Sequence, residues 1–131
     1  MKSVAILGAS TRPEKYGHRA VVAFAAAGFA VYPVNPRADE VAGWRCYPDA
    51  ASLPERPDVV SAYLPPALLM EVLPEWANRG CDELWLNPGA DGPGVMARAR
   101  ELGLTPVAVC SLIALAGGRL RVSDEANDGS S

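Results

Sequence analysis

Short apolar segments alternate with segments of helical length along most of the chain. Each apolar segment has the length of a buried strand, and most of them end at Gly, Asn or Pro, which interrupt regular structure. The predicted strands are residues 3–7, 29–34, 58–64, 82–86 and 105–110. The predicted helices between them are residues 17–27, 67–79 and 93–102. Strands that alternate with helices in this way favour a parallel sheet with right-handed crossover connections.

This order of elements predicts the α/β class, with a Rossmann-like, doubly wound parallel sheet in three layers. The expected strand order is 3-2-1-4-5-6, in which Trp44–Tyr47 forms a weak third strand that ends at Pro48. The helix 17–27 has very little polar surface, so we expect it to be buried against the sheet and to be a candidate contact for a second subunit. Residues 1–120 are expected to form this domain, and the polar residues 121–131 a disordered tail.

The loop that follows the first strand is the leading candidate for a binding site, because ligands of doubly wound sheets bind outside the carboxyl ends of the strands. A glycine, hydroxyl side chains and a helix start are suited to a phosphate group. The spacing is not that of the Gly-x-Gly-x-x-Gly dinucleotide motif, because Ser10 and Pro13 replace its second and third glycines. The alternative is an ordinary strand-to-helix turn with a capping hydroxyl. The candidate ligand-binding residues of this loop are Gly8, Ala9, Ser10, Thr11, Arg12 and Lys15.

Three more loops are predicted to end at the same edge of the sheet. Arg37 in the segment Asn35-Pro36-Arg37 suits a ribose phosphate, either the 2′-phosphate of NADP or the 3′-phosphate of coenzyme A, unless the segment is a solvated turn. The rigid segment Tyr63-Leu64-Pro65 offers either an apolar wall for an adenine ring or a simple helix entry. Residues 87–94, with Asn87 and Gly89, form a Gly- and Pro-rich loop that either covers a pantetheine arm or a nicotinamide, or is merely flexible.

Composition and charge exclude several classes of protein. The formal net charge of −3 and the isoelectric point near 5.1 are unlike those of a nucleic-acid binder. No apolar run reaches the length of a membrane span, and no signal peptide is visible, so we expect a cytoplasmic protein without a membrane partner. The 3 cysteines are widely spaced without a C-x-x-C motif, which favours free thiols over disulfides or a zinc site. His18 is the one histidine, and it is more typical of a capping residue than of a ligand.

The motifs together resemble a known family. The segments Val4–Ser10, Val31–Arg37, Cys46-Tyr47-Pro48 and Leu84–Gly89 resemble the small stand-alone coenzyme A-binding domain proteins, over roughly residues 3–110. These proteins are similar to the N-terminal domain of the succinyl-CoA synthetase alpha subunit and of ADP-forming acyl-CoA synthetases. The resemblance implies a Rossmann-like domain that binds coenzyme A or an acyl-CoA without chemistry of its own. It assigns Ser10, Thr11 and Arg12 to the phosphates, Asn35, Pro36 and Arg37 to the ribose and its phosphate, Tyr63, Leu64 and Pro65 to adenine, and Asn87 and Gly89 to the pantetheine side.

Two departures from the family pattern limit what the resemblance implies. Residues 110–116 are apolar where small members of the family have a Cys-x-Lys-x-Glu-like segment, which suggests packing or a subunit contact. The chain is also too short for the phosphohistidine domain and the ATP-binding subunit of the synthetases, so we expect no ligase activity from it alone. Two alternatives stay open: an NADP-binding oxidoreductase or redox-sensing domain, and a homodimeric interaction protein with a degenerate nucleotide site.

Overall fold

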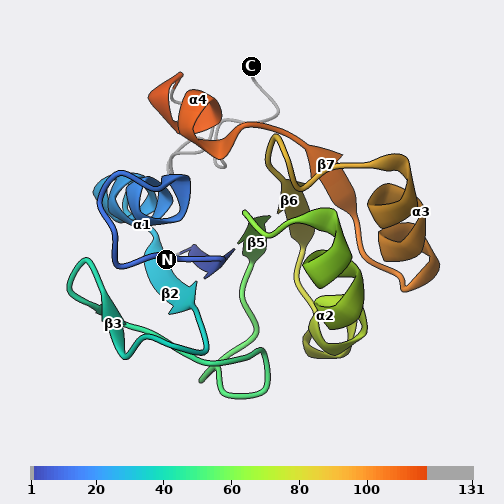
Figure 1. Ribbon diagram of the computed structural model, residues 1–131, viewed down its shortest axis with the longest axis horizontal. Coiled ribbons are helices and arrows are strands. Elements are labelled where there is room, and N and C mark those ends of the chain that lie inside the picture. Colours follow the sequence, from blue (N-terminus) through green and yellow to red (C-terminus); the bar gives the residue numbers. More distant parts are fainter. Residues whose placement is uncertain (1, 118–131) are drawn as a thin grey trace.

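The computed structural model describes residues 2–117 and has a five-stranded parallel sheet as its centre (Figure 1). The strand order is β2-β1-β5-β6-β7, and each neighbouring pair is parallel. The strands are β1 (Ser3–Leu7), β2 (Ala30–Val34), β5 (Val59–Ala62), β6 (Glu83–Leu86) and β7 (Pro106–Ala108). The helices are α1 (Tyr16–Ala26), α2 (Pro66–Arg79), α3 (Pro93–Glu101) and α4 (Ser111–Ala116). The predicted α/β class and Rossmann-like architecture are confirmed.

Helices cover both faces of the sheet, which gives three layers (Figure 1). Side chains of β1 alternate between the two layers because successive residues of a strand point to opposite faces. Val4 and Ile6 pack into a core with buried residues of α1, whereas Ala5 and Leu7 pack into a core with buried residues of α2 and α3. All of β1 is buried, as its continuous apolar sequence predicts for a central parallel strand.

The expected third strand of the main sheet is reduced to a single contact. Residues Glu40–Val41 (β3) and Trp44–Arg45 (β4) form a separate antiparallel hairpin, and only Tyr47 bridges to Val34 of β2. The turn at Ala42-Gly43 has positive φ at both residues, 51° and 86°, which is the geometry of a tight two-residue hairpin turn. The segment therefore pairs locally with β3 and meets β2 at Tyr47 alone.

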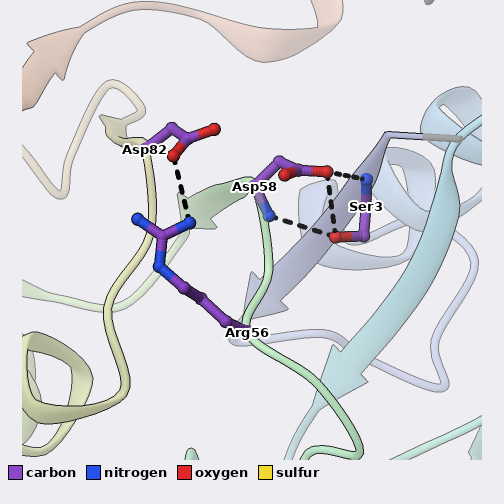
Figure 2. Close-up of polar contacts among 4 residues, drawn as sticks. All are labelled: Ser3, Arg56, Asp58 and Asp82. Carbon is purple, nitrogen blue, oxygen red and sulfur yellow. Dashed lines mark hydrogen bonds and ion pairs between the residues drawn. The ribbon is translucent and has the colours of Figure 1, made fainter.

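The strands are held together at their amino ends by a side chain that precedes β5 (Figure 2). Asp58 Oδ2 accepts hydrogen bonds from the Ser3 backbone N–H at 2.8 Å and from the Ser3 hydroxyl at 3.3 Å, and the Asp58 N–H donates to Ser3 Oγ at 3.0 Å. The Asp58 carbonyl accepts from the N–H groups of Asp82 and Glu83. Arg56 forms an ion pair with Asp82 at 3.0 Å. One residue therefore joins the starts of β1, β5 and β6.

The apolar segment near the end of the described chain forms α4, which packs against α1. Ala114 is buried in the core on that side, whereas Ile113 is 72% exposed, and Val22 on α1 is 51% exposed. The predicted packing role is therefore visible in part of the segment. The homodimer stays a prediction, for which these two exposed apolar side chains are the natural contact. The predicted tail, 121–131, lies outside the described residues.

Candidate functional site

A cleft of about 700 Å³ opens at the carboxyl ends of the strands, between the ends of β1, β2, β5 and β6 and one face of α2. This volume is in the range of small-molecule binding sites. The sequence predictions placed a site at this edge, and most of the predicted residues line the cleft. Those that do are Gly8, Ala9, Ser10, Lys15, Asn35, Pro36, Tyr63, Leu64, Pro65 and Gly89.

The loop after β1 begins with a glycine that no other residue replaces without strain. Gly8 has φ of +84°, and a Cβ there would lie 3.2 Å from the Tyr63 carbonyl carbon. Beyond it, the backbone N–H groups of Ala9, Ser10 and Thr11 donate to no acceptor among residues 2–117. Lys15 immediately precedes α1 and also lines the cleft. Unpaired N–H groups, a helix start and a cation at one end of a cleft form a suitable binding site for an anion.

Asn35 braces this loop from the end of β2. Its side-chain Nδ2 donates to the Ala9 carbonyl at 2.8 Å, and its Oδ1 accepts from the Arg37 N–H at 2.8 Å. Both polar atoms of the side chain are therefore engaged within the protein. The backbone N–H of Asn35 also donates to the Tyr47 carbonyl at 2.9 Å, which fixes the position of the Asn35 backbone. The geometry gives Asn35 a positioning role for the glycine loop, and the ribose contact that the resemblance implied stays a prediction.

Four predicted residues lie outside the lining of the cleft: the buried Asn87, and three residues on the surface. Thr11, Arg12 and Arg37 are exposed. The Arg12 guanidinium forms an ion pair with Glu14 at 3.0 Å on the surface, so its charge is already partly balanced. Arg37 makes no side-chain ion pair or hydrogen bond among the described residues, and its neighbours Asn35 and Pro36 do line the cleft. Arg37 is therefore available at the rim for a ligand that extends beyond the cleft.

Asn87 is buried and cannot contact a ligand in the cleft as predicted, since only 1% of its surface is exposed. Its Nδ2 donates to Ser61 Oγ at 3.0 Å and to the Ala62 carbonyl at 2.9 Å. Its Oδ1 accepts the Ser111 backbone N–H at 2.8 Å, and the hydroxyls of Ser61 and Ser111 are 2.9 Å apart. This network joins β5, β6 and α4 beneath the loop that contains Gly89. A polar side chain that follows a strand has the same sequence pattern whether it points into the core or outward.

Sequence analysis missed the wall that α2 contributes. One face of this helix lines the cleft, and the loop after the hairpin lies across from it with Pro48 and Asp49. The α2 residues recur at intervals of three, one, three and one, which is the spacing of a single helical face. That spacing was visible in the sequence, but it equally suits a face buried in the core. The lining residues on α2 are Leu68, Glu71, Val72, Glu75 and Trp76.

The remaining chemistry-bearing groups do not form a second site. Within the part of the chain that the structure describes, no three His, Cys, Asp or Glu side chains are grouped to hold a metal ion. All the cysteines are free, in agreement with the prediction, although only Cys46 is fully buried. Burial raises the pKa of the Cys46 thiol, and it raises the pKa of Cys81 to about 11, which makes both poor nucleophiles at neutral pH. His18 Nδ1 donates to the Ser10 carbonyl at 2.9 Å and so ties α1 to the loop; it does not cap the helix, since no side chain caps the start of α1.

Membrane association through a spanning helix finds no support in the described chain. Residues 2–117 contain no helix that has both the length and the apolar character to cross a bilayer. The cytoplasmic location stays a prediction.

The fold and the cleft define a Rossmann-like domain with a modified glycine loop. Comparison with protein families makes this assignment specific. The family model for the CoA binding domain matches residues 2–116, and the chain therefore belongs to that family. The predicted resemblance is confirmed.

Relatives of this chain include both long ligases and small single-domain proteins. Acetate–CoA ligase [ADP-forming] II of Archaeoglobus fulgidus is 37% identical over 81 residues, which are 60% of this chain but 12% of the ligase. A hypothetical protein of Pyrococcus horikoshii has a similar structure, with a TM-score of 0.82 and 30% identity over 91% of this chain and 84% of its own. A dinucleotide-forming acetyl-coenzyme A synthetase of Ca. Korarchaeum cryptofilum, in complex with phosphate and ADP, gives a TM-score of 0.72 at 26% identity, over 82% of this chain and 25% of its own.

Proposed function

We propose that this chain binds coenzyme A, or an acyl-CoA, in the cleft at the carboxyl ends of the strands, and that it does so without chemistry of its own. The observation that supports this most directly is the loop Gly8–Ser10, which lines the cleft beside Lys15 and in which the N–H groups of Ala9 and Ser10 have no acceptor among residues 2–117. The chain belongs to the CoA binding domain family, which favours coenzyme A as the anion that this loop binds.

In this proposal the pyrophosphate of coenzyme A lies against the glycine loop and the start of α1, where dipole and cation both favour negative charge. Leu64, Pro65 and Leu68 present apolar surface for the adenine ring. Arg37 at the rim is the partner for the 3′-phosphate, because its guanidinium has no partner among residues 2–117, whereas that of Arg12 is paired with Glu14. Gly89 and Pro88 border the exit for the pantetheine arm.

The alternative ligand, NADP, explains Arg37 equally well through a 2′-phosphate. The family assignment favours coenzyme A over it. The ligase activity named for the long relatives belongs to proteins of which this chain matches about an eighth. A binding module, which would deliver or sense an acyl-CoA, is the proposal that fits a cleft of this kind.

Thermal denaturation with added ligands tests the proposal. Coenzyme A should raise the melting temperature, because a ligand that binds only the folded state stabilises it. 3′-Dephospho-CoA should raise it less, since it lacks the group assigned to Arg37. The absence of any shift at millimolar coenzyme A would refute the proposal, and a larger shift with NADPH than with coenzyme A would favour the alternative.

A further inference from the structure

The proposed cleft for a polyanion contains two carboxylates that have no partner among the described residues. Glu71 and Glu75 both line it from α2, and neither side chain has a hydrogen bond or an ion pair among the described residues. They are four residues apart on one helix face, where like charges repel each other. Arg79 would be the natural partner of Glu75 one turn further on, but its Nη2 donates to the Leu53 carbonyl instead.

Other roles for these carboxylates are not supported by their surroundings. Asp49, across the cleft, is already engaged by the Ser52 N–H at 3.0 Å and the Ser52 hydroxyl at 2.6 Å. Within residues 2–117, Glu71 and Glu75 do not belong to any group of three metal-ligating side chains. Glu71 is exposed and Glu75 is partly exposed, so both carboxylates are open to N–H donors of a ligand, which would replace water there.

The layout of the cleft places these acceptors away from the anion-binding loop. α2 begins at the carboxyl end of β5, and by helical rise Glu71 and Glu75 lie roughly 7 and 13 Å along it. Leu68 and Val72 lie on the same helix face, beside the apolar segment Leu64-Pro65. The cleft thus has a cationic end at Lys15, an apolar middle and an anionic end on α2. A matching ligand has phosphates at one end, a flat apolar body and N–H donors at the other.

We propose that Glu71 and Glu75 select an amino-purine base by accepting hydrogen bonds from its exocyclic amino group. This inference rests on the proposed function, and it assigns to these residues both the direction of the bound nucleotide and the preference for adenine. The carboxylates repel phosphate from their end of the cleft, while the glycine loop and Lys15 attract it. A base with a 6-oxo group would place a carbonyl oxygen against a carboxylate, where neither atom can donate.

The test compares coenzyme A with its hypoxanthine analogue, in which an oxygen replaces the 6-amino group, by isothermal titration calorimetry. The unmodified protein should bind coenzyme A about tenfold more tightly than the analogue, since a hydrogen bond to a charged acceptor is worth about one decade in affinity. Glu71→Gln and Glu75→Gln should lower that ratio, because a glutamine amide can donate to the 6-oxo group. Glu101→Gln, which removes the same charge from an exposed pair on α3, should leave the ratio unchanged.

The outcomes separate this inference from the proposed function. If coenzyme A does not bind at all, the proposed function fails and this inference fails with it. If coenzyme A binds and the analogue binds equally well, the inference is wrong while the proposed function stands. Glu71→Gln and Glu75→Gln could instead weaken the binding of both ligands by the same factor. That result would place the carboxylates against the amides of the pantetheine arm, and it would also overturn base selection. Thermal melts of each variant without ligand confirm that it is folded.

Discussion

The carbonyl oxygen of Gly8 occupies the space that a side chain at Gly17 would need. An ideal Cβ at Gly17 would lie 2.1 Å from that oxygen, far inside van der Waals contact. The first turn of α1 therefore packs directly on the backbone of the loop after β1. This close approach brings Lys15 and the unpaired N–H groups of the loop to the same end of the cleft.

Replacing Gly17 with alanine should destabilise the fold by about 1–3 kcal/mol, because the atom that it displaces is backbone and cannot rotate away. The variant should also bind coenzyme A more weakly, since the loop has to move. Urea denaturation and calorimetry measure the two effects. Gly94→Ala is the matched control: it is in a helix with no neighbour within 4 Å, so it should be neutral or slightly stabilising. Equal denaturation midpoints for Gly17→Ala and Gly94→Ala would contradict the prediction.

Lys15 and Arg37 should have separable effects on binding if they contact different phosphates. Lys15→Ala should weaken coenzyme A and 3′-dephospho-CoA alike, each by about tenfold, because both ligands contain the pyrophosphate. Arg37→Ala should weaken coenzyme A by a similar factor and leave 3′-dephospho-CoA unchanged. Titration calorimetry of the four pairs gives the result. Arg100→Ala, on the exposed surface of α3, controls for the loss of a positive charge. An equal loss for both ligands in Arg37→Ala would remove this residue from the 3′-phosphate.

The buried Asn87 should be important for stability. Asn87→Ala leaves the Ser111 N–H and the Ala62 carbonyl without their side-chain partner, and a buried unsatisfied polar group costs about 1–3 kcal/mol. Chemical denaturation measures the loss. Asn78→Ala on the exposed side of α2 should change stability by less than about 0.5 kcal/mol. A similarly small change in Asn87→Ala would show that water replaces the lost partners.

Stability should fall at alkaline pH in a way that depends on Tyr32. Burial, and then the hydrogen bond from its hydroxyl to Glu55, raise the pKa of Tyr32 from 10.0 to about 12. The unfolded chain therefore releases this proton at lower pH than the folded chain does. The contribution of Tyr32 is complete below pH 10 and is lost as the pH rises toward 12. Tyr32→Phe should make the decline of the denaturation midpoint over this interval shallower. Tyr16→Phe is the control on an exposed tyrosine, and it should leave the slope as it is.

The sequence predicted the fold well where the pattern of apolar residues agreed with the positions of Gly, Asn and Pro, which interrupt regular structure. The β1 segment, the Gly8 turn and the helix after it were all found, because a buried central strand has a continuous apolar sequence. The third strand was overestimated at Trp44–Tyr47. Its residues suit a strand, but the Ala42-Gly43 turn pairs them locally, and this competition between two partners is not visible in a pattern of apolar positions.

The sequence predicted which loops form the candidate site more reliably than it predicted which side chains of those loops face the cleft. Parallel topology brings the ends of β1, β2, β5 and β6 together, so the backbone segments at Gly8, Asn35, Tyr63 and Gly89 were placed correctly. The direction of a side chain in a loop depends on its own hydrogen bonds. Arg12 turns to Glu14 and Asn87 turns to Ser61, and no spacing rule distinguishes these orientations from the expected ones.

The bonds between Ser3 and Asp58 lie at the opposite end of the strands from the cleft. The alignment of β1 with β5 and β6 is therefore anchored at the far edge, independently of the loops that meet the ligand. Replacement of the Gly8 loop by one of different length should leave β1, β5 and β6 in register, since the bonds between Ser3 and Asp58 and the strand ladders remain. The amino edge is thus the part of this domain to preserve when its cleft is redesigned.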